Sequence, residues 1–306
     1  MNHFLKTITF ALAAVAIFGG PQAWAAAALK VFACEPEWAA LATEIGGDRV
    51  DVFAATTGLQ DPHQIQARPS LIARMRNADI VICTGAELEV GWLPALLRQG
   101  ANPKVQPGSP GYFEAARQVA LRETPALLDR SQGDVHASGN PHIQTDPRNI
   151  LPVATALTDK FSGLDAAGAE TYRTRLAAFS TKWKTAMDGW QIQAAPLHGL
   201  PVLVQHKSWV YLLNWLSMKE IAPLEPKPGI APSTSYLADL LTKVAAEKPR
   251  MILVAAYEDD RGSKWMSEHA DIPVATLPFT VGGVAGTDTL TGLYDVTIQR
   301  LLAAIH

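Results

Sequence analysis

The sequence has few cysteines, no excess of positive charge and, after its first residues, no long segment without charged side chains. Its 306 residues include two cysteines, and 26 Lys and Arg against 29 Asp and Glu give a net charge of −3. Without a basic surface, nucleic acid is not an expected partner. The absence of a later apolar run of about 20 residues argues against a membrane span. Composition is otherwise globular, with 48% hydrophobic residues, and the length suggests two domains.

The N-terminus has the pattern of a secretory signal peptide. Lys6 precedes an apolar stretch over 8–19, and Ala23-Trp24-Ala25 fits the A-x-A cleavage pattern. We therefore assign residues 1–25 to a signal peptide and expect an exported protein. A lipid anchor is the competing interpretation, because Val31-Phe32-Ala33-Cys34 resembles a lipidation site.

Export would allow the two cysteines to pair. Cys34 and Cys83 each end an apolar run that we interpret as a parallel strand. A disulfide requires those strands to be neighbours, with Cα atoms about 4.4–6.8 Å apart. Two buried free thiols are the alternative, and the sequence leaves this choice open.

Short apolar runs alternate with helical patterns, which is typical of α/β folds. In the first half we expect strands near 29–34, 49–54, 79–84 and 118–121, and helices near 36–46, 67–78 and 87–99. After a helical stretch from Pro147 to about Gln193, we expect strands at 201–204, 251–254 and 272–275, and helices near 207–218, 232–248, 260–270 and 289–304. The predicted fold is two parallel-sheet lobes, 26–146 and 196–306, joined by one long helix within the segment 147–195.

Three histidines stand where predicted strands open into the cleft between the lobes. His63 lies in the loop after the second strand, His142 ends Gly139-Asn140-Pro141-His142, and His206 directly follows the strand 201–204. Ligands of parallel α/β sheets bind beyond the carboxyl ends of the strands. Imidazole nitrogen is a good ligand for borderline divalent metals, so the pattern predicts a metal site between the lobes.

A fourth ligand is expected from the second lobe. Asp288, ahead of the last helix, and Glu258, beyond the strand at 251–254, are the candidates. His136 either helps to capture metal or is an exposed bystander. Lys207 follows His206 directly, and a cation beside a divalent ion is unfavourable unless its side chain points away.

Three segments of the chain carry a resemblance to a known family. They are Asp61-Pro62-His63 with Arg68-Pro69-Ser70, Gly85-Ala86-Glu87-Leu88-Glu89 with Trp92-Leu93, and Gly139-Asn140-Pro141-His142 with Asp146-Pro147. In these segments the chain resembles the periplasmic metal-binding proteins of zinc and manganese ABC importers, the cluster 9 (A-I) family. The resemblance implies two four-stranded lobes bridged by a long helix. It also implies that His63, His142 and His206 bind the metal and that Asp288 matches the family's aspartate ahead of the last helix.

The residue types favour zinc as the transported ion. Three imidazoles and one carboxylate suit Zn²⁺, whereas Mn²⁺, the alternative, prefers more oxygen ligands. The resemblance implies a periplasmic monomer that delivers metal to an inner-membrane permease with a cytoplasmic ATPase. A secreted zinc hydrolase is a different class of function, in which water takes the fourth position. Its usual His-Glu-x-x-His spacing is absent, and we expect no catalysis.

Overall fold

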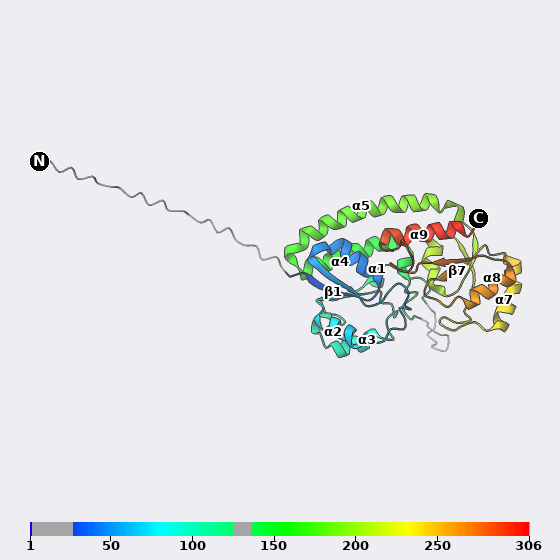
Figure 1. The fold of residues 1–306 in the computed structure, drawn as a ribbon, viewed down its shortest axis with the longest axis horizontal. Coiled ribbons are helices and arrows are strands. Elements are labelled where there is room, and N and C mark those ends of the chain that lie inside the picture. The colour runs from blue at the N-terminus through cyan, green and yellow to red at the C-terminus, as the bar shows by residue number, and fades with distance from the viewer. Residues whose placement is uncertain (2–26, 125–135, 306) are drawn as a thin grey trace.

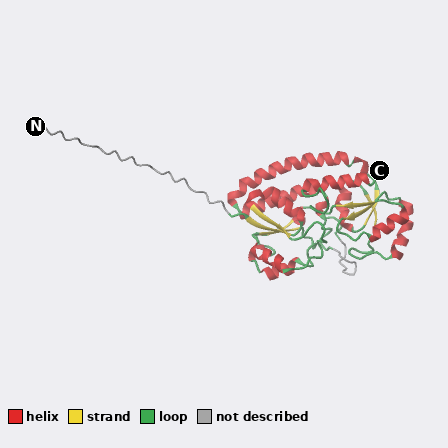
Figure 2. Ribbon diagram, viewed as in Figure 1, coloured by secondary structure: helices red, strands yellow, loops and turns green. Residues whose placement is uncertain are grey.

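The computed structural model describes Met1 and residues 27–124 and 136–305. The remainder of the predicted signal peptide after Met1 lies outside the described residues. None of the helices in the described part of the chain is long and apolar enough to cross a membrane. The described residues form two parallel sheets with helices packed around them, so the predicted α/β class with two sheets is confirmed (Figures 1 and 2).

The first sheet has four parallel strands in the order β2-β1-β3-β4. Its elements, in chain order, are β1 (Leu29–Ala33), α1 (Pro36–Gly46), β2 (Val50–Ala54), α2 (Pro69–Asn77), β3 (Ile80–Cys83), α3 (Leu93–Gly100) and β4 (Tyr112–Glu114). The side chains of β1 alternate between two cores, as the period of a strand requires. Val31 and Ala33 join the core that faces α1, whereas Phe32 and Cys34 join the core beneath α2 and α3.

The second sheet repeats this architecture with the order β6-β5-β7-β8, again all parallel. Its elements are β5 (Pro201–Val204), α6 (Val210–Trp215), β6 (Lys219–Pro223), α7 (Thr234–Glu247), β7 (Ile252–Ala255), α8 (Arg261–Ala270), β8 (Val274–Leu277) and α9 (Leu290–Ala303). Every residue of β7 is buried, because helices cover both faces of a parallel sheet. Side-chain caps at Ser233 and Thr289 fix where α7 and α9 begin.

The segment of sequence that connects the two sheets forms two helices, α4 (Ile150–Leu164) and α5 (Ala169–Gln193). The one long helix expected there is α5, with 25 residues, and a turn capped by Asp165 separates it from α4. Figure 1 shows α5 running along the side of the molecule that carries α1, α4 and α9. Trp183 and Trp190 of α5 contact Tyr294 of α9, so one continuous core joins both lobes.

Three predicted elements are wrong. No strand forms at 118–121; the fourth strand is Tyr112–Glu114, and Ala115–Gln118 is a single 3-10 turn. The strand β6 lies in the stretch between the expected helices 207–218 and 232–248, for which the sequence predicts no element, and the first of these helices spans only Val210–Trp215. The helix expected over 87–99 begins only at Leu93, since Ala86 and Glu87 adopt positive φ angles that a helix does not allow.

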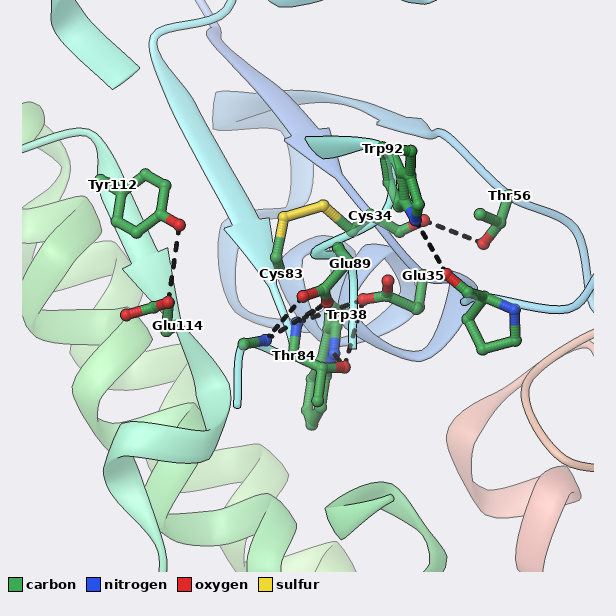
Figure 3. The surroundings of a disulfide bond; sticks show 12 residues. Cys34, Glu35, Trp38, Thr56, Cys83, Thr84, Glu89, Trp92, Tyr112 and Glu114 are labelled. Atoms are coloured by element: carbon green, nitrogen blue, oxygen red, sulfur yellow. Dashed lines mark hydrogen bonds between the residues drawn. A yellow bond between two sulfur atoms is a disulfide. The ribbon is translucent and has the colours of Figure 1, made fainter. Parts of the chain in front are cut away.

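Cys34 and Cys83 form a disulfide between the ends of β1 and β3 (Figure 3). The two strands are hydrogen-bonded neighbours, and the Cα atoms are 4.8 Å apart, which meets the condition that the sequence left open. Both residues are buried. The disulfide leaves Cys34 no thiol for a lipid anchor.

Candidate metal centre

The structure brings His63, His142 and His206 together from three distant segments. One ligand atom from each of the three side chains lies within 4.8 Å of the others. The ring centroids are 5.3 Å apart for His63 and His142, 5.8 Å for His63 and His206, and 5.6 Å for His142 and His206. A tetrahedral ion with bonds of about 2.0–2.1 Å spaces its ligand nitrogens about 3.4 Å apart. Small side-chain adjustments therefore suffice to bring these nitrogens around one ion.

His63 is held in a fixed orientation by Asp61. One carboxylate oxygen of Asp61 accepts from the backbone N–H of His63 at 2.9 Å and pairs with its ring Nδ1 at 2.8 Å. Trp92 Nε1 donates to the carbonyl of Pro62 at 2.8 Å and so holds the loop that carries His63. With Nδ1–H donated to the carboxylate, Nε2 carries the lone pair, and this buried atom has no hydrogen-bond partner.

His206 has an equivalent carboxylate partner in the second lobe. Its Nδ1 lies 2.6 Å from Oε2 of Glu225, which also accepts from the backbone N–H of Gly229 at 2.8 Å. Burial alone would lower the pKa of His206, but the hydrogen bond and charge of Glu225 outweigh it and raise the pKa above its ordinary value. A neighbouring carboxylate thus favours positive charge at this imidazole, whether the charge is a proton or a metal ion.

His142 is the most deeply buried of the three, with 1% of its surface exposed. Its backbone N–H donates to Oδ1 of Asn140 at 3.0 Å, and Asn140 in turn donates to the carbonyl of Lys207 at 2.8 Å. The hydroxyl of Tyr211 donates to the Asn140 carbonyl at 2.6 Å. These bonds tie the loop of His142 to the second lobe. Burial holds the pKa of His142 well below its usual range, and its Nδ1 has no partner, so a neutral imidazole faces the cluster.

His136 is not the exposed bystander that was one of its two interpretations. It is partly buried, with its ring centroid 5.4 Å from that of His63 and 6.2 Å from that of His142. Its Nε2 is buried without a hydrogen-bond partner. Burial lowers the pKa of His136 to about 3, so this imidazole is neutral as well.

The structure does not bring the predicted carboxylate ligands into the cluster. Asp288 is exposed, in a turn fixed by the buried hydroxyl of Thr287, which bonds to Val284. Glu258 lines a cavity with His63 and His206, but its Oε2 already accepts from the backbone N–H of Ala255 at 2.7 Å. Burial raises the pKa of Glu258 to about 7. Neither side chain is among those whose ligand atoms gather with the three histidines.

Lys207 points to Glu123, with Nζ 3.0 Å from Oε1. The condition for tolerating a lysine beside His206 is therefore met by an ion pair.

Two hollows flank the histidines. A cavity of about 540 Å³ is lined by His63 and His206 together with Asp61, Glu225 and Glu258. A second hollow of about 440 Å³ borders His136, His142 and His206 from the other side.

Sequence reasoning missed the carboxylates that orient the imidazoles. Asp61 stood in a quoted motif, two residues before His63, and this spacing was its only signal. Glu225 follows β6, the strand that was not predicted, so nothing placed it beside His206. A further group of possible ligands, Cys34, Cys83 and Glu89, has both sulfur atoms in the disulfide.

The fold and the histidine cluster define a two-lobed α/β metal-binding protein. A family model described as zinc-uptake complex component A, periplasmic (ZnuA), matches residues 31–304. The chain belongs to this family of periplasmic metal-binding components of ABC importers, which work with a membrane permease and an ATPase. The family consists of transporter substrate-binding proteins, not enzymes.

Curated relatives are distant and differ in the metal that their names state. The manganese ABC transporter substrate-binding lipoprotein PsaA of Streptococcus pneumoniae is 23% identical over 251 residues, which covers 77% of this chain and 74% of PsaA. The zinc-binding lipoprotein AdcA of Streptococcus pneumoniae strain ATCC BAA-255 / R6 is 21% identical over 238 residues, 76% of this chain but 46% of AdcA.

Solved structures share the fold at similarly low sequence identity. A crystal structure of ZnuA has a TM-score of 0.75 at 21% identity and covers 91% of this chain and 100% of its own. A manganese-bound mutant of a periplasmic metal-binding protein from Candidatus Liberibacter asiaticus has a TM-score of 0.74 at 15% identity, with the same coverage.

Proposed function

We propose that the exported protein captures Zn²⁺ in the periplasm through His63, His142 and His206 and delivers it to an inner-membrane permease powered by a cytoplasmic ATPase. The observation that carries this proposal is the convergence of three imidazoles whose ligand atoms lie within 4.8 Å of one another. The protein acts as a monomer and performs no reaction on the metal.

The ligand chemistry favours zinc over manganese and iron. The gathered ligand atoms are imidazole nitrogens, which suit Zn²⁺, whereas Mn²⁺ prefers carboxylate, carbonyl and water oxygen. The nearby carboxylates Asp61 and Glu225 are engaged with ring Nδ1 atoms, so they support imidazole ligands without serving as ligands themselves. Manganese is the second candidate, because a relative with three quarters of its length matched is named for that metal.

Calorimetric titration of the metal-free protein with Zn²⁺, Mn²⁺ and Fe²⁺ tests the proposal. We expect one tight zinc site, weaker binding of the other two ions, and a loss of more than about 10-fold in zinc affinity for His63→Ala, His142→Ala or His206→Ala. This is a lower bound, because removing even a hydrogen-bond partner of a ligand costs about 10–100-fold. His198→Ala is the matched control, since His198 is exposed and remote from the cluster in the fold.

Three results would contradict the proposal in whole or in part. If the parent protein has no tight zinc site, it shares only its fold with the zinc-binding relatives. Variants of the three histidines that bind zinc as well as His198→Ala does would mean that the metal is held elsewhere. If Mn²⁺ binds more tightly than Zn²⁺, the protein would still be an importer component, but the ion that it carries would be manganese.

A further inference from the structure

His136 lies on the first-lobe side of the histidine cluster, next to His63 and His142. Its ring is as close to His63, at 5.4 Å between centroids, as His63 is to His142, at 5.3 Å. Its separation from His142, 6.2 Å, is only slightly larger than those within the three-histidine cluster. His136 therefore borders the cluster at His63 and His142, while the ligand atoms within 4.8 Å of one another are those of His63, His142 and His206.

The backbone around His136 is fastened to the first lobe. The N–H of Ala137 donates to Oε2 of Glu87 at 2.6 Å, and the N–H of Gly139 donates to the His136 carbonyl at 3.2 Å. Glu87 itself has a positive φ of 68°, a conformation that costs energy for a residue with a Cβ. The chain thus turns unfavourably at Glu87, and the carboxylate of this residue holds the segment that carries His136.

The ring of His136 has an unused acceptor. Its Nε2 is buried without a partner, as are Nε2 of His63 and Nδ1 of His142. A buried polar atom without a hydrogen bond is unfavourable, and one such atom could be accidental. Three on adjacent imidazoles share a simple explanation, since a single cation would satisfy all of them.

The competing donors for a fourth position are less suited. Asp288 is exposed, in a turn fixed through Thr287. Glu258 already accepts hydrogen bonds from the backbone of Ala255 and the hydroxyl of Ser208. Of the candidates, His136 alone combines proximity to His63 with a free, buried ring nitrogen.

We infer that His136 is the fourth protein ligand, which completes a four-imidazole site with His63, His142 and His206. This inference rests on the proposed function, because it describes the same metal centre. An all-nitrogen shell excludes the oxygen ligands that Mn²⁺ prefers and suits Zn²⁺ and, among other ions, Cu²⁺. His136 would then set the selectivity of the carrier as well as its affinity.

The test compares His136→Ala with Asp288→Asn and with the control His198→Ala, using Zn²⁺ and Mn²⁺ calorimetry and the visible spectrum of the Co²⁺ form. We expect His136→Ala to weaken zinc binding more than about 10-fold, to change manganese affinity less, and to alter the Co²⁺ absorption that reports coordination geometry. Asp288→Asn should match His198→Ala in all three readouts. Thermal unfolding of each metal-free variant separates ligand loss from misfolding, and His136→Gln, which keeps a polar side chain of similar size, should show the same loss.

The outcomes separate this inference from the proposed function. If the parent binds zinc tightly and His136→Ala behaves as His198→Ala does, the inference is wrong and the carrier stands. If Asp288→Asn loses affinity and His136→Ala does not, the fourth ligand is Asp288. If the parent has no tight zinc site, both proposals fail.

Discussion

Both lobes place glutamates beyond the carboxyl ends of their sheets, but the two sets have different surroundings. In the first lobe Glu35 and Glu89 lie beneath the disulfide, with 2% of the surface of each exposed (Figure 3). In the second lobe Glu225 and Glu258 line a cavity beside His206. Glutamates at equivalent places in the two lobes therefore contact different groups. Those of the first lobe contact backbone N–H groups and each other, whereas Glu225 of the second lobe contacts an imidazole.

Burial shifts the first-lobe carboxyls toward the neutral form, against the hydrogen bonds that they accept from the backbone. The backbone N–H of Thr84 donates to Glu89 at 2.7 Å and to Glu35 at 3.2 Å. Burial raises the pKa of Glu35 well above its usual range, with a further rise from Glu89, and burial raises the pKa of Glu89 to about 7. Glu225 of the second lobe instead contacts an imidazole, with its Oε2 2.6 Å from Nδ1 of His206. In the proposed carrier, burial alone does not give a carboxyl a part in metal binding; the carboxyl also needs one of the proposed imidazole ligands as its neighbour.

The largest expected effect follows from removing the disulfide, which should lower the stability of the protein but leave its zinc affinity nearly unchanged. The disulfide closes a loop of 49 residues, and in the chain-entropy model its loss costs about 4 kcal/mol of unfolding free energy. We expect Cys34→Ser with Cys83→Ser to lose roughly this much in urea unfolding. Zinc affinity should change less than about twofold, because the disulfide contacts none of the four histidines. A parallel fall in affinity would show that the two regions are coupled.

Glu225→Gln should have the reverse profile. The amide keeps the shape of Glu225 but cannot give the His206 imidazole the negative charge that supports metal binding. We expect zinc affinity to fall by about 10–100-fold with little change in thermal stability, as measured by calorimetry and by melting of the metal-free protein. Equal zinc affinity in Glu225→Gln and in Glu89→Gln would remove the distinction between the two sets of carboxyls.

Glu89→Gln should stabilise the protein at neutral and higher pH. Because the folded-state pKa of Glu89 is raised to about 7, the folded protein keeps a proton that the unfolded chain releases above about pH 4.5. Stability from this group is therefore complete below about pH 4.5 and is lost as pH rises through about 7. The amide is neutral throughout and can donate to Oε1 of Glu35, which has no partner.

The measurement is the melting temperature of Glu89→Gln and of the parent at pH 4.5 and pH 8. We expect a rise of a few degrees at pH 8, equivalent to about 1–3 kcal/mol, and little difference at pH 4.5. A constant difference across this range would mean that Glu89 does not hold the proton.

How far the sequence predicts this molecule depends on whether a feature is local. The hydrophobic runs that became β1, β3, β5 and β7 are central strands, buried on both sides, and continuous apolar runs identify such strands. Two of the four edge strands, β4 and β6, are partly exposed and lack this pattern. From the sequence, the first is misplaced and the second is missed, although the other two edge strands, β2 and β8, are predicted.

The site shows the same limit. His63, His142 and His206 could be selected because each follows a predicted strand or a motif. The partner Glu225 is 19 residues from His206, and His136 lies beside His63 across 73 positions of sequence; both contacts exist only through tertiary packing. The buried state of Glu35 and Glu89 could not be predicted either, because carboxylates after a strand also suit an exposed helix start.

The smallest expected effect concerns Lys207, the one cation next to a proposed ligand in sequence. Its Nζ lies 3.0 Å from Glu123, and 39% of each side chain is exposed, so water and salt screen its charge. An ion pair of this kind contributes about 0.2–1 kcal/mol. We therefore expect Lys207→Met to change zinc affinity and stability less than about threefold and about 1 kcal/mol, respectively. Lys264→Met, which removes an exposed pair with Asp260, is the matched control. A gain of more than about 10-fold in zinc affinity for Lys207→Met alone would show that the lysine turns toward the metal and opposes its binding. The second lobe would then act on the ion with a cation as well as with Glu225, the carboxylate that pairs with His206.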